Sequence, residues 1–160
     1  MLLIVVRGRR QSWRMSNPAD ALVEQTHRIF DLTDQKDWPG VRACLADDVF
    51  VDFTSLAGGE PATITGDALT AAWTAGLHAE KASYHLCGNH RITVGGDTAT
   101  VAVKGYAYNQ LSARLGGAVF EVWGAYDLGF ALVGDTWLCT AFRFDAWRQS
   151  GDLTVRTHTL

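Results

Sequence analysis

The chain has 160 residues, of which 14 are Lys or Arg and 17 are Asp or Glu. A chain of this length fits one domain with its own apolar core, so it needs neither disulfide bonds nor metal ions for stability. Its basic residues are not clustered, which argues against a nucleic-acid partner. The three cysteines, Cys44, Cys87 and Cys139, form no C-x-x-C pair and indicate a reducing, cytoplasmic location.

The first fourteen residues, MLLIVVRGRRQSWR, place an apolar run before positive charge. This order is the reverse of a secretory signal, and the run is too short to cross a bilayer, so we expect no membrane partner. Met15 begins MSNPADALVEQ, which is typical of a helix start. We therefore expect residues 1–14 to be a disordered upstream extension and Met15 the natural start. A single domain should cover residues 15–150, followed by a C-terminal tail over 151–160.

Helical patterns dominate the first half of the domain. Asn17 can cap a helix, Pro18 suits its first turn, and apolar residues then recur near helical spacing, which predicts a helix over about 18–35. Three further elements are predicted by spacing and composition, a short helix, a strand and a third helix, at residues 37–46, 47–53 and 66–79.

Beyond residue 81 the pattern changes to long alternating strands. Glycine-containing turns separate them, at Gly95-Gly96, Gly116-Gly117 and Gly134-Asp135. Three helices followed by an antiparallel sheet predict an α+β domain with the helices on one face of the sheet.

Both faces of the late strands carry apolar residues. In one strand Tyr126, Leu128 and Phe130 share a face, and the residues between them share the other. One face should meet the helices and the other a second subunit. We therefore expect a homodimer whose interface is built on Tyr126, Leu128 and Phe130 or on their strand neighbours.

Four segments carry a resemblance to a known family: DQKDW, VFVDFTSL, YHLCGNHRITVGGDTATV and GDTWLCTAFRFDAWR. Together they resemble the SnoaL-like branch of the nuclear transport factor 2-like superfamily, over about residues 17–148. The resemblance implies a cone-like curved antiparallel sheet wrapped around three N-terminal helices, with an internal apolar pocket. The superfamily includes dehydratases, isomerases and polyketide cyclases as well as proteins without catalysis.

The resemblance also implies a catalytic pair. In scytalone dehydratase and hexachlorocyclohexane dehydrochlorinase, an Asp at the end of the first helix pairs with a His on the strand after the third, and the matching residues here are Asp34 and His85. A carboxylate that fixes the imidazole tautomer and stabilises the imidazolium would make His85 a general base. The alternative is a core histidine satisfied by a backbone carbonyl, with Asp34 solvating a helix end.

Five more positions match pocket residues of scytalone dehydratase or lie beside them. Thr33 and Phe53 match its two tyrosines, Asn109 a histidine and Asp127 an asparagine, while Trp123 is expected to form an apolar wall. Asn109 could orient a substrate carbonyl, or could satisfy a strand turn. Asp127 could act as an acid or base, or could pair with a nearby arginine.

No metal or cofactor is predicted, because no two histidines share the spacing of a zinc site on one helix and no phosphate-binding glycine loop is present. The leading hypothesis is a cofactor-independent lyase, isomerase or cyclase acting on a hydrophobic, ring-containing ketone or polyketide-like molecule. The competing hypothesis is a non-catalytic binding or scaffold protein, as in the small subunits of ring-hydroxylating dioxygenases. An open cavity beside a bonded Asp34–His85 pair would favour catalysis.

Overall fold

The computed structural model describes residues 17–160, so the predictions on residues 1–14 and on Met15 lie outside it. Helices and strands alternate in the first half, and long strands fill the second. The helices are α1 (Pro18–Gln35), α2 (Trp38–Ala43), α3 (Thr54–Ala57), α4 (Gly66–Gly76) and α5 (Leu153–Thr157), with one 3-10 turn, η1 (Ala113–Leu115). The strands are β1 (Leu45–Asp52), β2 (Ala62–Thr65), β3 (Lys81–Gly95), β4 (Thr98–Leu111), β5 (Val119–Val133) and β6 (Thr136–Gly151).

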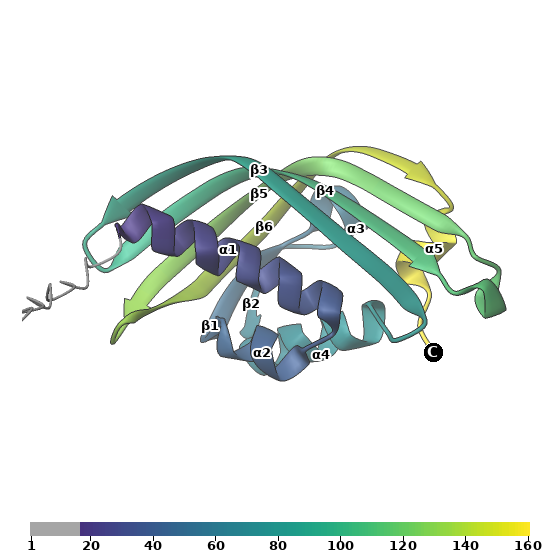
Figure 1. The fold of residues 1–160 in the computed structure, drawn as a ribbon, viewed down its shortest axis with the longest axis horizontal. Coiled ribbons are helices and arrows are strands. Elements are labelled where there is room, and N and C mark those ends of the chain that lie inside the picture. Colours follow the sequence, from purple (N-terminus) through teal and green to yellow (C-terminus); the bar gives the residue numbers. More distant parts are fainter. Residues whose placement is uncertain (1–16) are drawn as a thin grey trace, which may run out of the picture.

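The strands form one sheet in the order β2-β1-β6-β5-β4-β3. It is mixed, because β1 runs parallel to β6 while every other neighbouring pair is antiparallel. Figure 1 shows the sheet curving over α1, α2 and α4, which lie together on its concave side. The predicted α+β class and cone-like architecture are confirmed.

Helix α1 begins and ends where local chemistry requires. The Asn17 side chain accepts a hydrogen bond from the Ala19 N–H at 3.1 Å, and Pro18 occupies the first turn. The helix ends at Gln35, and the following residue, Lys36, caps it with a left-handed φ of 62°. Its predicted bounds are confirmed, and its apolar stripe is buried against the sheet through Leu22, Ile29 and Phe30.

The concave face of the sheet holds the residues that sequence analysis assigned to a subunit interface. Tyr126, Leu128 and Phe130 are only 4%, 1% and 1% exposed. The ring of Tyr126 lies 4.8 Å from that of Phe30 on α1, centroid to centroid. The proposed interface on these three side chains is therefore wrong. Alternation identifies which residues share a face, but it cannot say which face meets the helices.

Two glycines let aromatic rings lie close to the sheet. Gly105 of β4 faces Gly124 of β5 in the strand register, and the β5–β6 pairing shifts next to Gly124. A Cβ on Gly105 would lie 2.2 Å from the ring of Tyr126, and one on Gly124 would lie 2.1 Å from the Asp145 carbonyl oxygen. The bare backbone at these positions creates the room that Tyr126 and Phe144 occupy.

Four short elements have no counterpart among the predicted ones: α3, β2, η1 and α5. Helix α5 lies in the stretch expected to be a tail, yet its Val155 is completely buried. Asp152 caps it by accepting a hydrogen bond from the Thr154 N–H at 2.8 Å. Across residues 17–160, no helix is both long and apolar enough to cross a membrane.

Candidate active site

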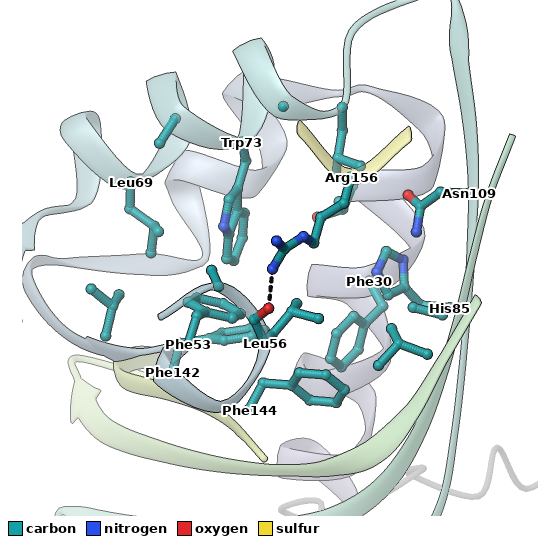
Figure 2. Close-up of a pocket in the computed structure, with 18 of the residues that line it drawn as sticks. Phe30, Phe53, Leu56, Leu69, Trp73, His85, Asn109, Phe142, Phe144 and Arg156 are labelled. Atoms are coloured by element: carbon teal, nitrogen blue, oxygen red, sulfur yellow. Dashed lines mark hydrogen bonds between the residues drawn. The ribbon is translucent and has the colours of Figure 1, made fainter. Parts of the chain in front are cut away.

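An apolar cavity of about 480 Å³ lies between the helices and the concave face of the sheet. Its walls are mainly aliphatic and aromatic, with Phe30, Trp73, Phe142 and Phe144 among them (Figure 2). The few polar side chains come from α1, β3, β4, β5 and α5. Such a cavity has the size and composition of a site for a small organic molecule.

His85 lies on the wall of this cavity and is bound by Asp34 through two hydrogen bonds. Its Nδ1 lies 2.7 Å from Asp34 Oδ1, and its backbone N–H donates to Asp34 Oδ2, also at 2.7 Å. The second bond exists because β3 is an edge strand, so N–H groups on its outer side have no strand partner. Phe30 stacks on the imidazole with the ring centroids 5.3 Å apart. The side chain is thus fixed by both hydrogen bonding and packing.

A short polar chain extends from this pair towards the end of α1. The Ser83 hydroxyl donates to Asp34 Oδ1 at 2.8 Å, and Lys36 Nζ donates to Ser83 Oγ at 2.5 Å. Ser83 precedes His85 by two residues on β3, so both side chains point to the same side of the strand. Asp34 is therefore held by Ser83 as well as by His85.

These contacts lower the pKa of Asp34 and set the tautomer of the imidazole. Burial alone would raise the pKa of Asp34, but the hydrogen bonds and charge of His85 and the hydrogen bond from Ser83 outweigh it, and the net pKa is lowered from 3.8. An ionised carboxylate only accepts hydrogen bonds, so Nδ1 carries the proton. Nε2 has no protein partner among residues 17–160 and is the nitrogen left for a bound molecule.

The lowered pKa of Asp34 predicts a pH-dependent contribution to stability. Because the folded-state pKa lies below the ordinary 3.8, the ionised carboxylate stabilises the fold above that pH, and this stabilisation is lost as the pH falls through the folded-state pKa. Urea unfolding should show the wild type to be more stable than Asp34→Asn at about pH 5, with the gap shrinking towards about pH 3. A gap of the same size at both pH values would contradict this assignment.

Besides His85, five polar side chains line the cavity: Thr33, Lys81, Asn109, Tyr126 and Arg156. Burial strongly raises the pKa of Tyr126, so its phenol stays protonated and can donate a hydrogen bond. Lys81 is only 1% exposed and donates to the backbone oxygens of Gly76 and His158, at 2.6 and 3.0 Å. Within residues 17–160, no group of three His, Cys, Asp or Glu side chains is arranged to hold a metal ion.

The structure brings together five of the seven residues singled out from the sequence. His85, Asn109, Thr33 and Phe53 line the cavity, and Asp34 lies directly behind His85. The Thr33 hydroxyl donates to the Ile29 carbonyl at 2.7 Å within α1, so it is already satisfied. Asn109 shares the inner face of β4 with the buried Ala107.

The other two residues, Asp127 and Trp123, lie on the convex face of the sheet. Asp127 is exposed, and Trp123 packs between Tyr106, at 5.3 Å between ring centroids, and Arg148. The expectation that they face the pocket is wrong for the same reason as the interface on Tyr126: the two faces of β5 were assigned the wrong way round. Arg143, opposite Asp127 in the register, instead lies 3.4 Å from Asp52.

Several residues of the site were not predicted from the sequence. Lys81 reads as the polar start of a strand, and Ser83 carries no pattern of its own. Arg156 falls in the stretch taken as a tail, although Asp152 two residues before Thr154 is a helix-cap signal that could have identified α5. Tyr126 was assigned to the wrong face.

An open α+β cone with a ligand-sized apolar cavity is the architecture of nuclear transport factor 2-like proteins. The chain belongs to the SnoaL-like domain family, which matches residues 15–143. Among curated proteins, none matches the sequence.

Solved structures with this fold cover most of the chain. The Kfla4162 protein from Kribbella flavida is 25% identical, with a TM-score of 0.81 over 88% of this chain and 97% of that one. A protein from Novosphingobium aromaticivorans, whose name assigns it to the scytalone dehydratases, is 16% identical, with a TM-score of 0.72 over 83% and 86%. The type 2 hexachlorocyclohexane dehydrochlorinase LinA is 12% identical, with a TM-score of 0.64 over 84% and 88%. At 16% and 12% sequence identity, the similarity to these two proteins is evidence for a shared fold and for nothing more.

Proposed function

We propose that this protein is a cofactor-independent lyase, isomerase or cyclase that acts on a hydrophobic, ring-containing ketone or polyketide-like molecule. The observation that carries the proposal is the 2.7 Å contact between His85 Nδ1 and Asp34 at the wall of an open apolar cavity. A filled cavity would have favoured a scaffold. The names of a scytalone dehydratase and a dehydrochlorinase among the structural neighbours agree with elimination chemistry.

In the proposed reaction, His85 Nε2 removes a proton from a carbon next to the substrate carbonyl. The C–H electron pair moves into the carbonyl to form an enolate, and Asp34 stabilises the imidazolium that results. The Asn109 amide or the Tyr126 hydroxyl can donate a hydrogen bond to the enolate oxygen. The enolate then re-forms the carbonyl. In isomerisation its electron pair forms a C–H bond at another carbon with the proton of the imidazolium; in elimination the pair forms a C=C bond and expels the leaving group, which the imidazolium protonates.

A ligand screen followed by an assay tests this proposal. Purified protein is mixed with a panel of aromatic ketones and polyketide-like compounds, because a ligand that binds the folded state raises the melting temperature. Compounds that raise it are incubated with the protein and followed by mass spectrometry for loss of water, loss of halide or double-bond migration. Binding by ketones without conversion of any of them would favour the competing, non-catalytic binding role.

We further propose a homodimer formed through the convex face of the sheet. Tyr84 and Leu86 of β3 are 55% and 57% exposed there, next to the Tyr106–Trp123 aromatic pair, and such a patch favours association. Leu86→Arg should convert the dimer to a monomer in sedimentation velocity at micromolar concentration. Ala71→Arg on the exposed side of α4 adds the same charge and should leave the dimer intact. A wild-type monomer would contradict the proposal.

A further inference from the structure

The closing residues of the chain bring a cation into the cavity. Helix α5 is anchored by the buried Val155, and the next residue, Arg156, lines the cavity. Figure 2 shows the Arg156 guanidinium extending into the pocket, with Trp73 on one side and His85 and Asn109 on the other. This side chain takes no part in the proton transfer proposed above.

The hydrogen-bonding capacity of this guanidinium is only partly used. Its Nη1 donates to the Leu56 carbonyl of α3, as the dashed line in Figure 2 marks. Its Nε is buried and has no partner within residues 17–160. A buried donor without a partner is costly, and a guanidinium without a counter-ion more so.

Within residues 17–160, no side chain that lines the cavity balances this charge. None of the described residues that line the cavity is acidic, and Asp34, behind the imidazole, is occupied by His85 and Ser83. The other cation, Lys81, differs from Arg156 because two backbone carbonyls already accept its hydrogen bonds. Of the two cationic side chains, Arg156 is therefore the one whose buried N–H group, at Nε, makes no hydrogen bond within residues 17–160.

We infer that Arg156 binds an anionic group of the ligand, with a carboxylate as the best fit. A guanidinium presents paired N–H donors in a plane, which matches the two oxygens of a carboxylate. The inference deepens the proposed function and rests on it, because it narrows the ligand to a ring-containing acid. The carboxylate would lie at Arg156, the rings against Trp73 and Phe142, and the reacting carbon at His85.

A matched pair of probes tests carboxylate binding by Arg156, which we call the anchor, in an experiment that needs no turnover. We would measure the dissociation constants of 2-naphthoate and the neutral 2-naphthamide by isothermal titration calorimetry at neutral pH. The wild type should bind the carboxylate at least about tenfold more tightly than the amide, since hydrogen bonds between charged groups are stronger than those to a neutral amide. Equal affinities, or no binding of either probe at millimolar concentration, would overturn the inference.

Variants then assign the preference to Arg156. Arg156→Gln keeps a donor for the Leu56 carbonyl but removes the charge, and it should abolish the preference for the carboxylate. Arg156→Lys keeps the charge and should retain part of the preference, which covers the case in which Arg156→Gln fails to fold. Arg28→Gln removes an equal charge from the exposed side of α1 and should leave the preference unchanged. A preference that survives in folded Arg156→Gln, or a complete loss in folded Arg156→Lys, would contradict the anchor.

His85→Gln separates this inference from the proposed function. It should retain the preference for the carboxylate while losing turnover. If turnover depends on His85 but the acid and the amide bind equally, the function stands and the anchor falls. If the preference depends on Arg156 but His85→Gln still turns over substrate, the anchor stands and the general-base function falls.

Discussion

His85→Ala should reduce kcat by roughly 10²- to 10⁴-fold, the contribution expected of a positioned general base. His85 lines the cavity and its Nδ1 is bound to Asp34, so Nε2 is the nitrogen left to accept a proton. Two other polar groups of the described lining are poor replacements. Lys81 is already bonded to two backbone carbonyls, and burial keeps the Tyr126 phenol protonated. The rate constant is measured with whichever compound the ligand screen identifies.

Asp34→Asn should also lower kcat strongly, because the amide neither fixes the Nδ1–H tautomer nor stabilises the imidazolium. The double variant His85→Ala/Asp34→Asn should be little worse than His85→Ala alone, since the two residues act as a unit. Asn109→Ala serves as the comparison inside the cavity and should lose less than either. Near-wild-type kcat in folded His85→Ala, or additive losses in the double variant, would remove the pair from the mechanism.

Gly124→Ala should destabilise the fold by about 3 kcal/mol, the upper end of what overpacking costs. The new methyl group would lie 2.1 Å from the Asp145 carbonyl oxygen and 2.8 Å from the ring of Phe144, and a backbone atom of the neighbouring strand cannot yield cheaply. For a chain of this size, this corresponds to a fall of about 6 to 12 °C in Tm. Differential scanning calorimetry gives the value directly.

Gly88→Ala is the matched control for Gly124→Ala, because Gly88 also lies in a strand and an added Cβ there meets nothing within 4 Å. Its Tm should stay near that of the wild type, or rise slightly through loss of unfolded-state entropy. Gly105→Ala should behave like Gly124→Ala and should also displace Tyr126 towards the cavity. Equal Tm values for Gly88→Ala and Gly124→Ala would show that the sheet can relax at this point.

Local sequence chemistry was sufficient to predict the elements with strong signals. The cap at Asn17, the proline after it and the apolar stripe predict α1, and glycine turns mark the ends of the long strands. These features depend on residues a few positions apart, so they can be read without knowing the fold. The short helix α3 has no side-chain cap and was missed, and α5 was missed although Asp152 caps it.

The sequence by itself therefore determined the α+β class, the main elements and, through the resemblance, the candidate pair Asp34 and His85. Only the tertiary structure decided which face of β5 lines the cavity, because alternation along a strand is symmetric between its two faces. In the structure Tyr126 lines the pocket, whereas Asp127 and Trp123 lie on the opposite, convex face. It was also the tertiary structure that brought Arg156 to a carbonyl of α3, because the contact joins residues a hundred positions apart and no local pattern encodes it.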